Sequence, residues 1–85
     1  MMTKANMIET LKLREAKQWT AYQNQREWCK VFFRDKEESE WSGIPQDALN
    51  IYMKEWSATF DILQLLKIEP YTWSERQQLI IESKI

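Results

Sequence analysis

Apolar residues recur at helical spacing in two long stretches of the chain, and together they predict a helical hairpin. Residues three and four apart share one face of a helix. The first row reads Ile8, Leu11, Glu15, Trp19, Tyr22, Arg26, Cys29 and Phe33. The second row reads Leu49, Met53, Trp56, Phe60, Leu63 and Lys67. Two rows of this kind predict two helices that pack against each other through these faces.

Helix-breaking residues divide the chain at two places and so define three predicted helices. Gly43, the only glycine, and Pro45 mark a turn over residues 41–45, and Pro70 ends the second helix. The first helix is predicted over about 4–39, the second over about 46–67 and the third over about 73–84. Thr72 and Glu75 form a capping-box pattern before the third. The fold class is therefore all-α: an antiparallel helical hairpin with a short C-terminal third helix, in a single domain over residues 1–85.

Folding the chain back near Trp41 gives one antiparallel register in which both rows match. The pairs are Phe33–Leu49, Cys29–Met53, Arg26–Trp56, Tyr22–Phe60, Trp19–Leu63 and Glu15–Lys67. Registers displaced by one heptad are the alternatives. One sets Arg26 against Leu63, and the other puts the turn inside the acidic run and leaves Glu15 opposite Phe60. The first register is preferred because every charged residue then has a favourable partner.

The sequence from Trp28 to Phe33 leaves a local alternative open, because its aromatic and β-branched residues also favour a strand. No turn signal stands on both sides of this segment, and the helical period continues through it. The helix is therefore the preferred interpretation.

The second helix carries another apolar row, nearly opposite the one that faces the first helix. Its members are Ile51, Ala58, Ile62 and Leu65. One partner helix cannot bury both sides, and the row is nearly symmetric about Ala58, as a two-fold interface requires. These four residues therefore predict the interface of a homodimer that forms a helical bundle. The alternative is that the third helix, or the overhanging start of the first, covers the row within one chain.

The first helix has a thinner second row in Leu13, Trp28 and Val31. Tryptophan is enriched at the energetic centres of protein interfaces, so these residues are candidates for binding a partner protein. The alternative is that they are buried, or exposed without function, since isolated apolar residues are common on protein surfaces.

Composition excludes several kinds of chemistry. The 85 residues contain one cysteine, no histidine and one glycine. An intrachain disulfide, a Cys/His zinc site, a histidine acid–base pair and a glycine-rich phosphate loop therefore cannot form. Cys29 lies on the core row, where it is expected to act as a small apolar residue. No catalytic, metal-binding or cofactor-binding residue is predicted, and the chain is not expected to be an enzyme.

Charge and hydropathy narrow the choice of partners. Twelve basic and thirteen acidic residues give a net charge of −1, and the two signs are interspersed. Lys30, Arg34 and Lys36 form the one basic patch with aromatic residues, but acidic residues follow it directly, which disfavours nucleic acid. No apolar run reaches the ~20 residues of a membrane span, and the start lacks the pattern of a signal peptide, so a cytoplasmic protein without a membrane partner is expected.

These observations predict a non-enzymatic protein–protein interaction module, homodimeric, that acts by occluding or bridging a partner protein, as phage or prophage accessory and inhibitor proteins do. The alternative is a small nucleic-acid-associated regulatory protein, for which a basic face on the folded chain would be the distinguishing feature.

Overall fold

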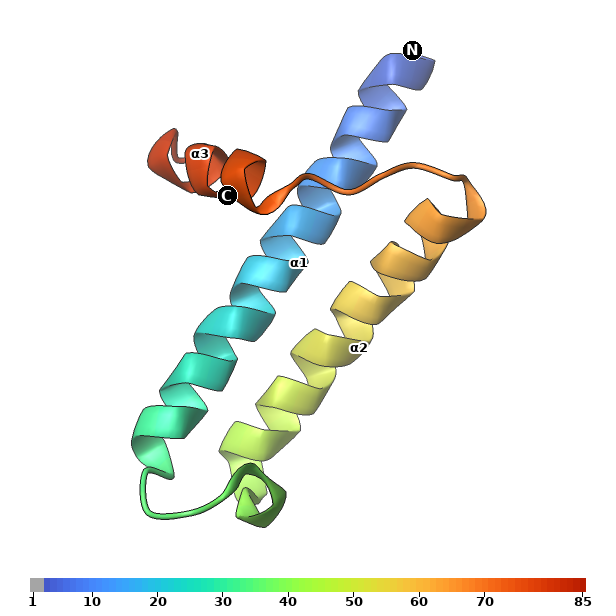
Figure 1. The fold of residues 1–85 in the computed structure, drawn as a ribbon. Helices are drawn as coiled ribbons and strands as arrows, with labels where there is room; N and C mark the ends of the chain where they lie inside the picture. The colour runs from blue at the N-terminus through green and yellow to red at the C-terminus, as the bar shows by residue number, and fades with distance from the viewer. Residues whose placement is uncertain (1–2) are drawn as a thin grey trace.

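Three α-helices make up most of the structure, a computed structural model that describes residues 3–85 (Figure 1). They are α1 (Lys4–Phe32), α2 (Gly43–Leu65) and α3 (Trp73–Ile81), and a short 3-10 turn, Glu38–Glu40, lies between α1 and α2. No strand occurs within the described range, so the helical interpretation of residues 28–33 holds as far as Phe32. The molecule is elongated, with extents of 49 × 27 × 20 Å. The all-α prediction with three helices is confirmed.

α1 begins where the sequence predicts and ends earlier. The hydroxyl of Thr3 accepts a hydrogen bond from the backbone N–H of Asn6 at 3.1 Å, which caps the helix. The helix ends at Phe32 and not near residue 39. The acidic residues that follow would lie at the negative end of the helix dipole, and the chain instead leaves the helix before them. The hairpin loop is therefore longer than the predicted turn.

Both ends of α2 are set by residues in the left-handed region. Gly43 has a φ of +76°, and the helix starts there, with Pro45 in its first turn, where no backbone N–H is needed. At the other end Lys67 has a φ of +56°. The backbone N–H of Lys67 donates to the carbonyl of Gln64 at 3.1 Å, and that of Ile68 donates to Leu63 at 2.9 Å. This is a Schellman-type helix end, and it turns the chain sharply away from α2.

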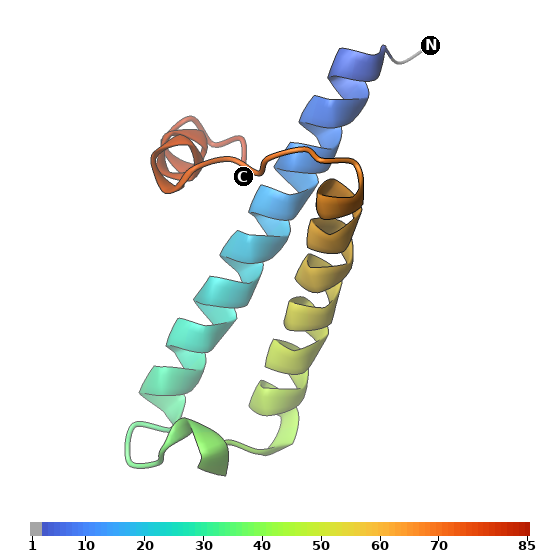
Figure 2. The same cartoon turned by 45° about the vertical axis from the view of Figure 1, so that its right-hand side comes forward.

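α3 has the predicted capping box. The Thr72 hydroxyl accepts from the backbone N–H of Glu75 at 3.2 Å, and the Glu75 carboxylate accepts from the backbone N–H of Thr72 at 2.9 Å. The helix ends at Ile81, short of the predicted residue 84. In the two views of Figures 1 and 2, α1 stands between α3 and α2. α3 is therefore packed on α1, away from the outer side of α2.

The hairpin register differs from the preferred prediction by about one heptad. Trp56 packs against Trp19 and Tyr22, with ring centroids 5.1 and 6.4 Å apart, and does not pair with Arg26. Arg26 instead donates to the exposed Glu38 carboxylate at 3.2 Å. Because α1 ends early, the loop begins earlier in the chain than predicted. α2 therefore packs about one heptad nearer the start of α1 than in the preferred register. It is the displaced register that puts the turn inside the acidic run and leaves Glu15 opposite Phe60, without Lys67 as its partner.

The core is small and concentrated at the hairpin tip. Cys29, Phe33, Trp41 and Leu49 form one buried cluster, against which Tyr22 packs. Trp41 belongs to the loop, yet only 8% of its surface is exposed. The loop thus closes the end of the hairpin, and it contributes core side chains that the periodic rows alone did not identify. A core of this size is marginal for a chain of this length.

Candidate functional site

An uncovered apolar surface runs along the outer side of α2, and we call it the outward face: Ile51, Ala58, Ile62 and Leu65. Leu49 and Leu63, on the opposite side of the helix, are buried in the hairpin. Ile51 is 56% exposed, Ile62 41% and Leu65 83%, and Ala58 is exposed as well. The alternative that α3 covers this row is wrong, because α3 packs on α1 instead. Exposed apolar patches are among the surfaces at which soluble proteins bind partners, so this face is the first candidate site.

Charged residues border the outward face at its middle. At about 100° per residue, Lys54 and Asp61 lie on one flank of Ala58, and Glu55 lies on the other. All three side chains are exposed. None of them makes an ion pair within residues 3–85. Lys54 and Asp61 cannot reach each other closely, because they stand two helical turns apart, at ~10 Å along the axis. These charges are therefore available to a partner.

A second exposed apolar surface lies at the end of α1, and we call it the tip patch: Trp28, Val31 and Phe32. Trp28 is 50% exposed, and its ring stacks on Phe32 with centroids 5.0 Å apart and planes 13° from parallel. Val31 is 75% exposed. Phe32 was missed by the sequence analysis because it belongs to neither apolar row. Its position four residues after Trp28 was the available signal.

Leu13, the third partner-binding candidate on α1, does not join the tip patch. It is only partly exposed, and it stands four turns from Trp28, at ~22 Å along the helix. Its neighbours in a shallow surface hollow are Thr10, Arg14, Lys17 and Gln18. The structure therefore groups Trp28 with Val31 and separates Leu13 from both.

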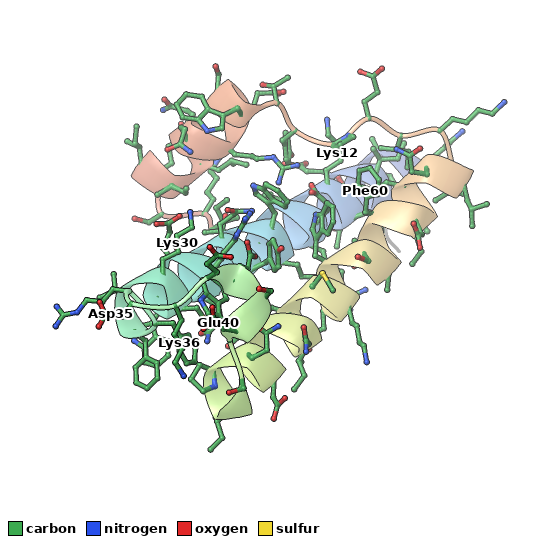
Figure 3. The ribbon with its side chains drawn as sticks, turned by 60° about the horizontal axis from the view of Figure 1, so that its bottom comes forward. Lys12, Lys30, Asp35, Lys36, Glu40 and Phe60 are labelled. Carbon is green, nitrogen blue, oxygen red and sulfur yellow. The ribbon has the colours of Figure 1, made fainter. Side chains whose placement is uncertain are left out.

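The basic side chains near the tip lie among acidic ones. Figure 3 shows Lys30, Asp35, Lys36 and Glu40 at the same end of the hairpin, with Lys12 and Phe60 toward the other. Lys30 Nζ is 3.0 Å from the Glu27 carboxylate, and Arg26 pairs with Glu38. Of the basic patch Lys30, Arg34 and Lys36, only Lys30 makes an ion pair within residues 3–85, and Lys36 Nζ lies 6.0 Å from the centre of the Phe33 ring.

The junction between α3 and the hairpin contains a fully buried carboxylate. Glu15 is 0% exposed, and it accepts hydrogen bonds from Arg76 Nη2 at 2.7 and 2.8 Å and from Trp56 Nε1 at 2.8 Å. Arg76 also donates through Nε to the backbone carbonyl of Tyr71 at 2.9 Å, and its guanidinium lies 5.6 Å from the Trp19 ring. These contacts anchor α3. Sequence reasoning missed Arg76, because nothing local to α3 shows that its partner lies in α1.

Two clefts open beside this anchor. A cleft of about 420 Å³ opens beside it between α1 and α3, lined in part by Trp19, Trp73 and Arg76. Glu15 does not line that cleft, but it does line an adjoining cleft of about 200 Å³ together with Trp56 and Phe60, although its side chain is 0% exposed. The junction is a structural contact that positions α3.

Cys29 sits in the core cluster, where the sequence placed it. Burial raises the pKa of its thiol above the ordinary value of 9.0, and the hydrogen bond from Gln25 offsets part of that rise. Its Sγ lies 3.5 Å from the carbonyl oxygen of Pro45, so the thiol joins α1 to the start of α2. A buried thiol with a raised pKa is a poor nucleophile.

Two further properties concern the whole described range. Residues 3–85 contain no group of three or more histidine, cysteine, aspartate or glutamate side chains placed to hold a metal ion. None of the helices in that range is both long and apolar enough to cross a membrane.

We compared the chain with models of protein families, with characterised proteins and with solved structures, and none of the three comparisons gave a match.

Proposed function

We propose that this protein is a non-enzymatic interaction module that dimerises through the outward face of α2 and presents its tip patches to a partner protein. The observation that carries the proposal is the apolar row along α2, which the rest of residues 3–85 leaves uncovered. The core is small, and small domains often gain stability by association. A second copy would remove Ile51, Ile62 and Leu65 from water and supply that stability.

Two tip patches on one dimer suit an occluding or bridging role. Each patch is apolar and aromatic and lies at the hairpin-loop end of α1, whereas Ala58 lies in the second half of α2, toward the other end of the hairpin. A dimer that forms through α2 would therefore leave both patches accessible. Stacked aromatic residues on a surface are typical anchors for a protein partner.

Substitution of Ala58 by arginine tests the dimer. The residue lies at the centre of the proposed interface and is exposed within one chain, so Ala58→Arg should leave the helical circular-dichroism signal unchanged while sedimentation gives the mass of a monomer. Ala5→Arg, at an exposed position on α1, is the matched control and should sediment as wild type. A wild-type protein that stays monomeric throughout the micromolar range would refute the proposal.

A further inference from the structure

The charged side chains on either side of Ala58 indicate how a second copy would be oriented on α2. Lys54 precedes Ala58 by four residues and Asp61 follows it by three. On a helix these positions lie about 40° and 60° from Ala58, on the same flank. Both side chains are exposed, and neither has an ionic partner within the part of the chain that the structure describes. A basic and an acidic group thus stand on one side of the apolar row, one before its centre and one after it.

We infer that two copies pack antiparallel across α2, in a register fixed by two reciprocal ion pairs between Lys54 of each copy and Asp61 of the other. The inference rests on the dimer proposed above and adds its register and orientation. Rotation by 180° about an axis through the contact at Ala58 maps each flank of α2 onto the same flank of the second helix. A residue four before Ala58 then lies level with the residue four after it in the other copy. Lys54 is therefore within one residue's rise, ~1.5 Å along the axis, of the level of Asp61.

The same operation pairs the apolar residues. Ile51 and Leu65 stand seven residues on either side of Ala58, so each meets the other across the axis. Ala58 meets its own copy, and a small side chain at the crossing allows the helices to approach closely. Glu55 is level with Asp61 of the other copy but lies on the opposite flank of the apolar row. It therefore remains at the solvent edge.

Other arrangements of two copies lose these pairs. In a parallel dimer in register, the two-fold axis runs along the helices and maps each flank onto the opposite one, so Lys54 would lie beside Glu55 of the other copy and Asp61 would have no basic partner. In an antiparallel dimer displaced by one heptad toward the helix start, Asp61 would lie level with Ala48, and Lys54 would have no acidic residue level with it on its own flank. Lys54 and Asp61 thus pair with each other only in the antiparallel dimer centred on Ala58, and this self-complementary pattern favours a second copy of this chain as the occupant of the surface. The Glu55→Lys variant described below separates this dimer from the parallel one, because Glu55→Lys would weaken only the parallel dimer.

Charge reversal tests the register directly. Lys54→Glu places two acidic groups at each pairing position, and Asp61→Lys places two basic groups there. Each single variant should therefore weaken its own dimer by about tenfold or more, since both symmetric contacts change from attraction to repulsion. The double variant Lys54→Glu/Asp61→Lys restores opposite charges and should return the dissociation constant to within about threefold of wild type.

A mixture of the two single variants gives a sharper result. In a heterodimer of the K54E copy with the D61K copy, both pairing positions hold opposite charges again. Native mass spectrometry of the mixture, with one variant isotopically labelled, should therefore show the heterodimer in clear excess over both homodimers. Glu55→Lys makes the same change in net charge as Asp61→Lys on the other flank, and Lys4→Glu does so for Lys54→Glu on α1. Both control variants should dimerise like the wild type and show no preference on mixing.

The outcomes separate the register from the dimer itself. If Ala58→Arg abolishes the dimer but the single charge variants dimerise like the wild type and mix at random, the inferred register is wrong and the dimer proposal stands. If the wild-type protein is monomeric, the second copy is not the occupant, and both proposals fail. Circular dichroism of each variant should match the wild type, because Lys54 and Asp61 are exposed.

Discussion

Arg76 in α3 and Glu15 in α1 form a buried ion pair, with both carboxylate oxygens within 2.8 Å of one guanidinium nitrogen. The two residues are far apart in sequence, and their contact fixes where α3 sits. It also explains why a carboxylate can occupy the inner face of α1, because Arg76 and the Trp56 indole together satisfy it. The helix that carries Arg76 thereby holds the rest of the C-terminal segment against α1.

Loss of Arg76 should destabilise the whole protein. Arg76→Ala leaves the Glu15 carboxylate buried with a single donor, Trp56, and we expect a loss of about 3–5 kcal/mol in the free energy of unfolding, measured by urea denaturation at fixed protein concentration. Arg14→Ala, on the exposed side of α1, should change it by less than about 0.5 kcal/mol. Removal of both charges in Glu15→Leu/Arg76→Met should be less harmful than Arg76→Ala alone. If Arg76→Ala and the double variant lost the same free energy of unfolding, the pair would not be buried in solution.

The capping box should make α3 sensitive to acid. Hydrogen bonds from the Thr72 backbone and then its side chain lower the pKa of Glu75 below the ordinary value of 4.5. The folded form therefore favours the charged carboxylate, and the stability that this provides is complete above the unfolded pKa and is lost as the pH falls through the folded pKa. Carbon NMR titration of Glu75 should give a lowered pKa, and Thr72→Ala should raise it. Alanine keeps the backbone N–H of residue 72, so a pKa that stays unchanged in Thr72→Ala would contradict only the contribution of the Thr72 side chain.

The Cys29 thiol should react slowly in the folded protein. It is fully buried, and burial raises its pKa, so we expect alkylation at mildly basic pH to be at least about tenfold slower than in denaturant. A Ser74→Cys variant in a Cys29→Ser background carries its thiol at an exposed position of α3 and should react at nearly the denatured rate. Comparable native rates for the two thiols would mean that the hairpin tip opens readily.

Two tryptophans near the hairpin tip should respond differently to truncation. Trp41 is 8% exposed and belongs to the core cluster, so Trp41→Ala should cost about 3–5 kcal/mol of stability. Trp28 is half exposed, so Trp28→Ala should cost less than about 1 kcal/mol. Chemical denaturation of the two variants measures both values. A reversed order would place the core on the other side of α1 and would remove Trp28 from the proposed partner surface.

Features set by a few neighbouring residues were predictable, and features set by distant contacts were not. The Thr72–Glu75 box and the left-handed Gly43 follow from local backbone rules. The outward face of α2 follows from the period of one helix. The hairpin register does not, because registers one heptad apart differ mainly in what surrounds Glu15. Its true partner, Arg76, lies in another helix, and the long loop that carries Trp41 gave no periodic signal.

The left-handed conformation of Lys67 has a consequence for the outer side of α2. By turning the chain back across α1, it makes α1 the internal scaffold of the molecule, flanked by a helix on two sides, and leaves α2 with a helix on one side only. The exposure of Ile51 and Leu65 on the outward face therefore depends on the direction in which the chain leaves α2 at Lys67.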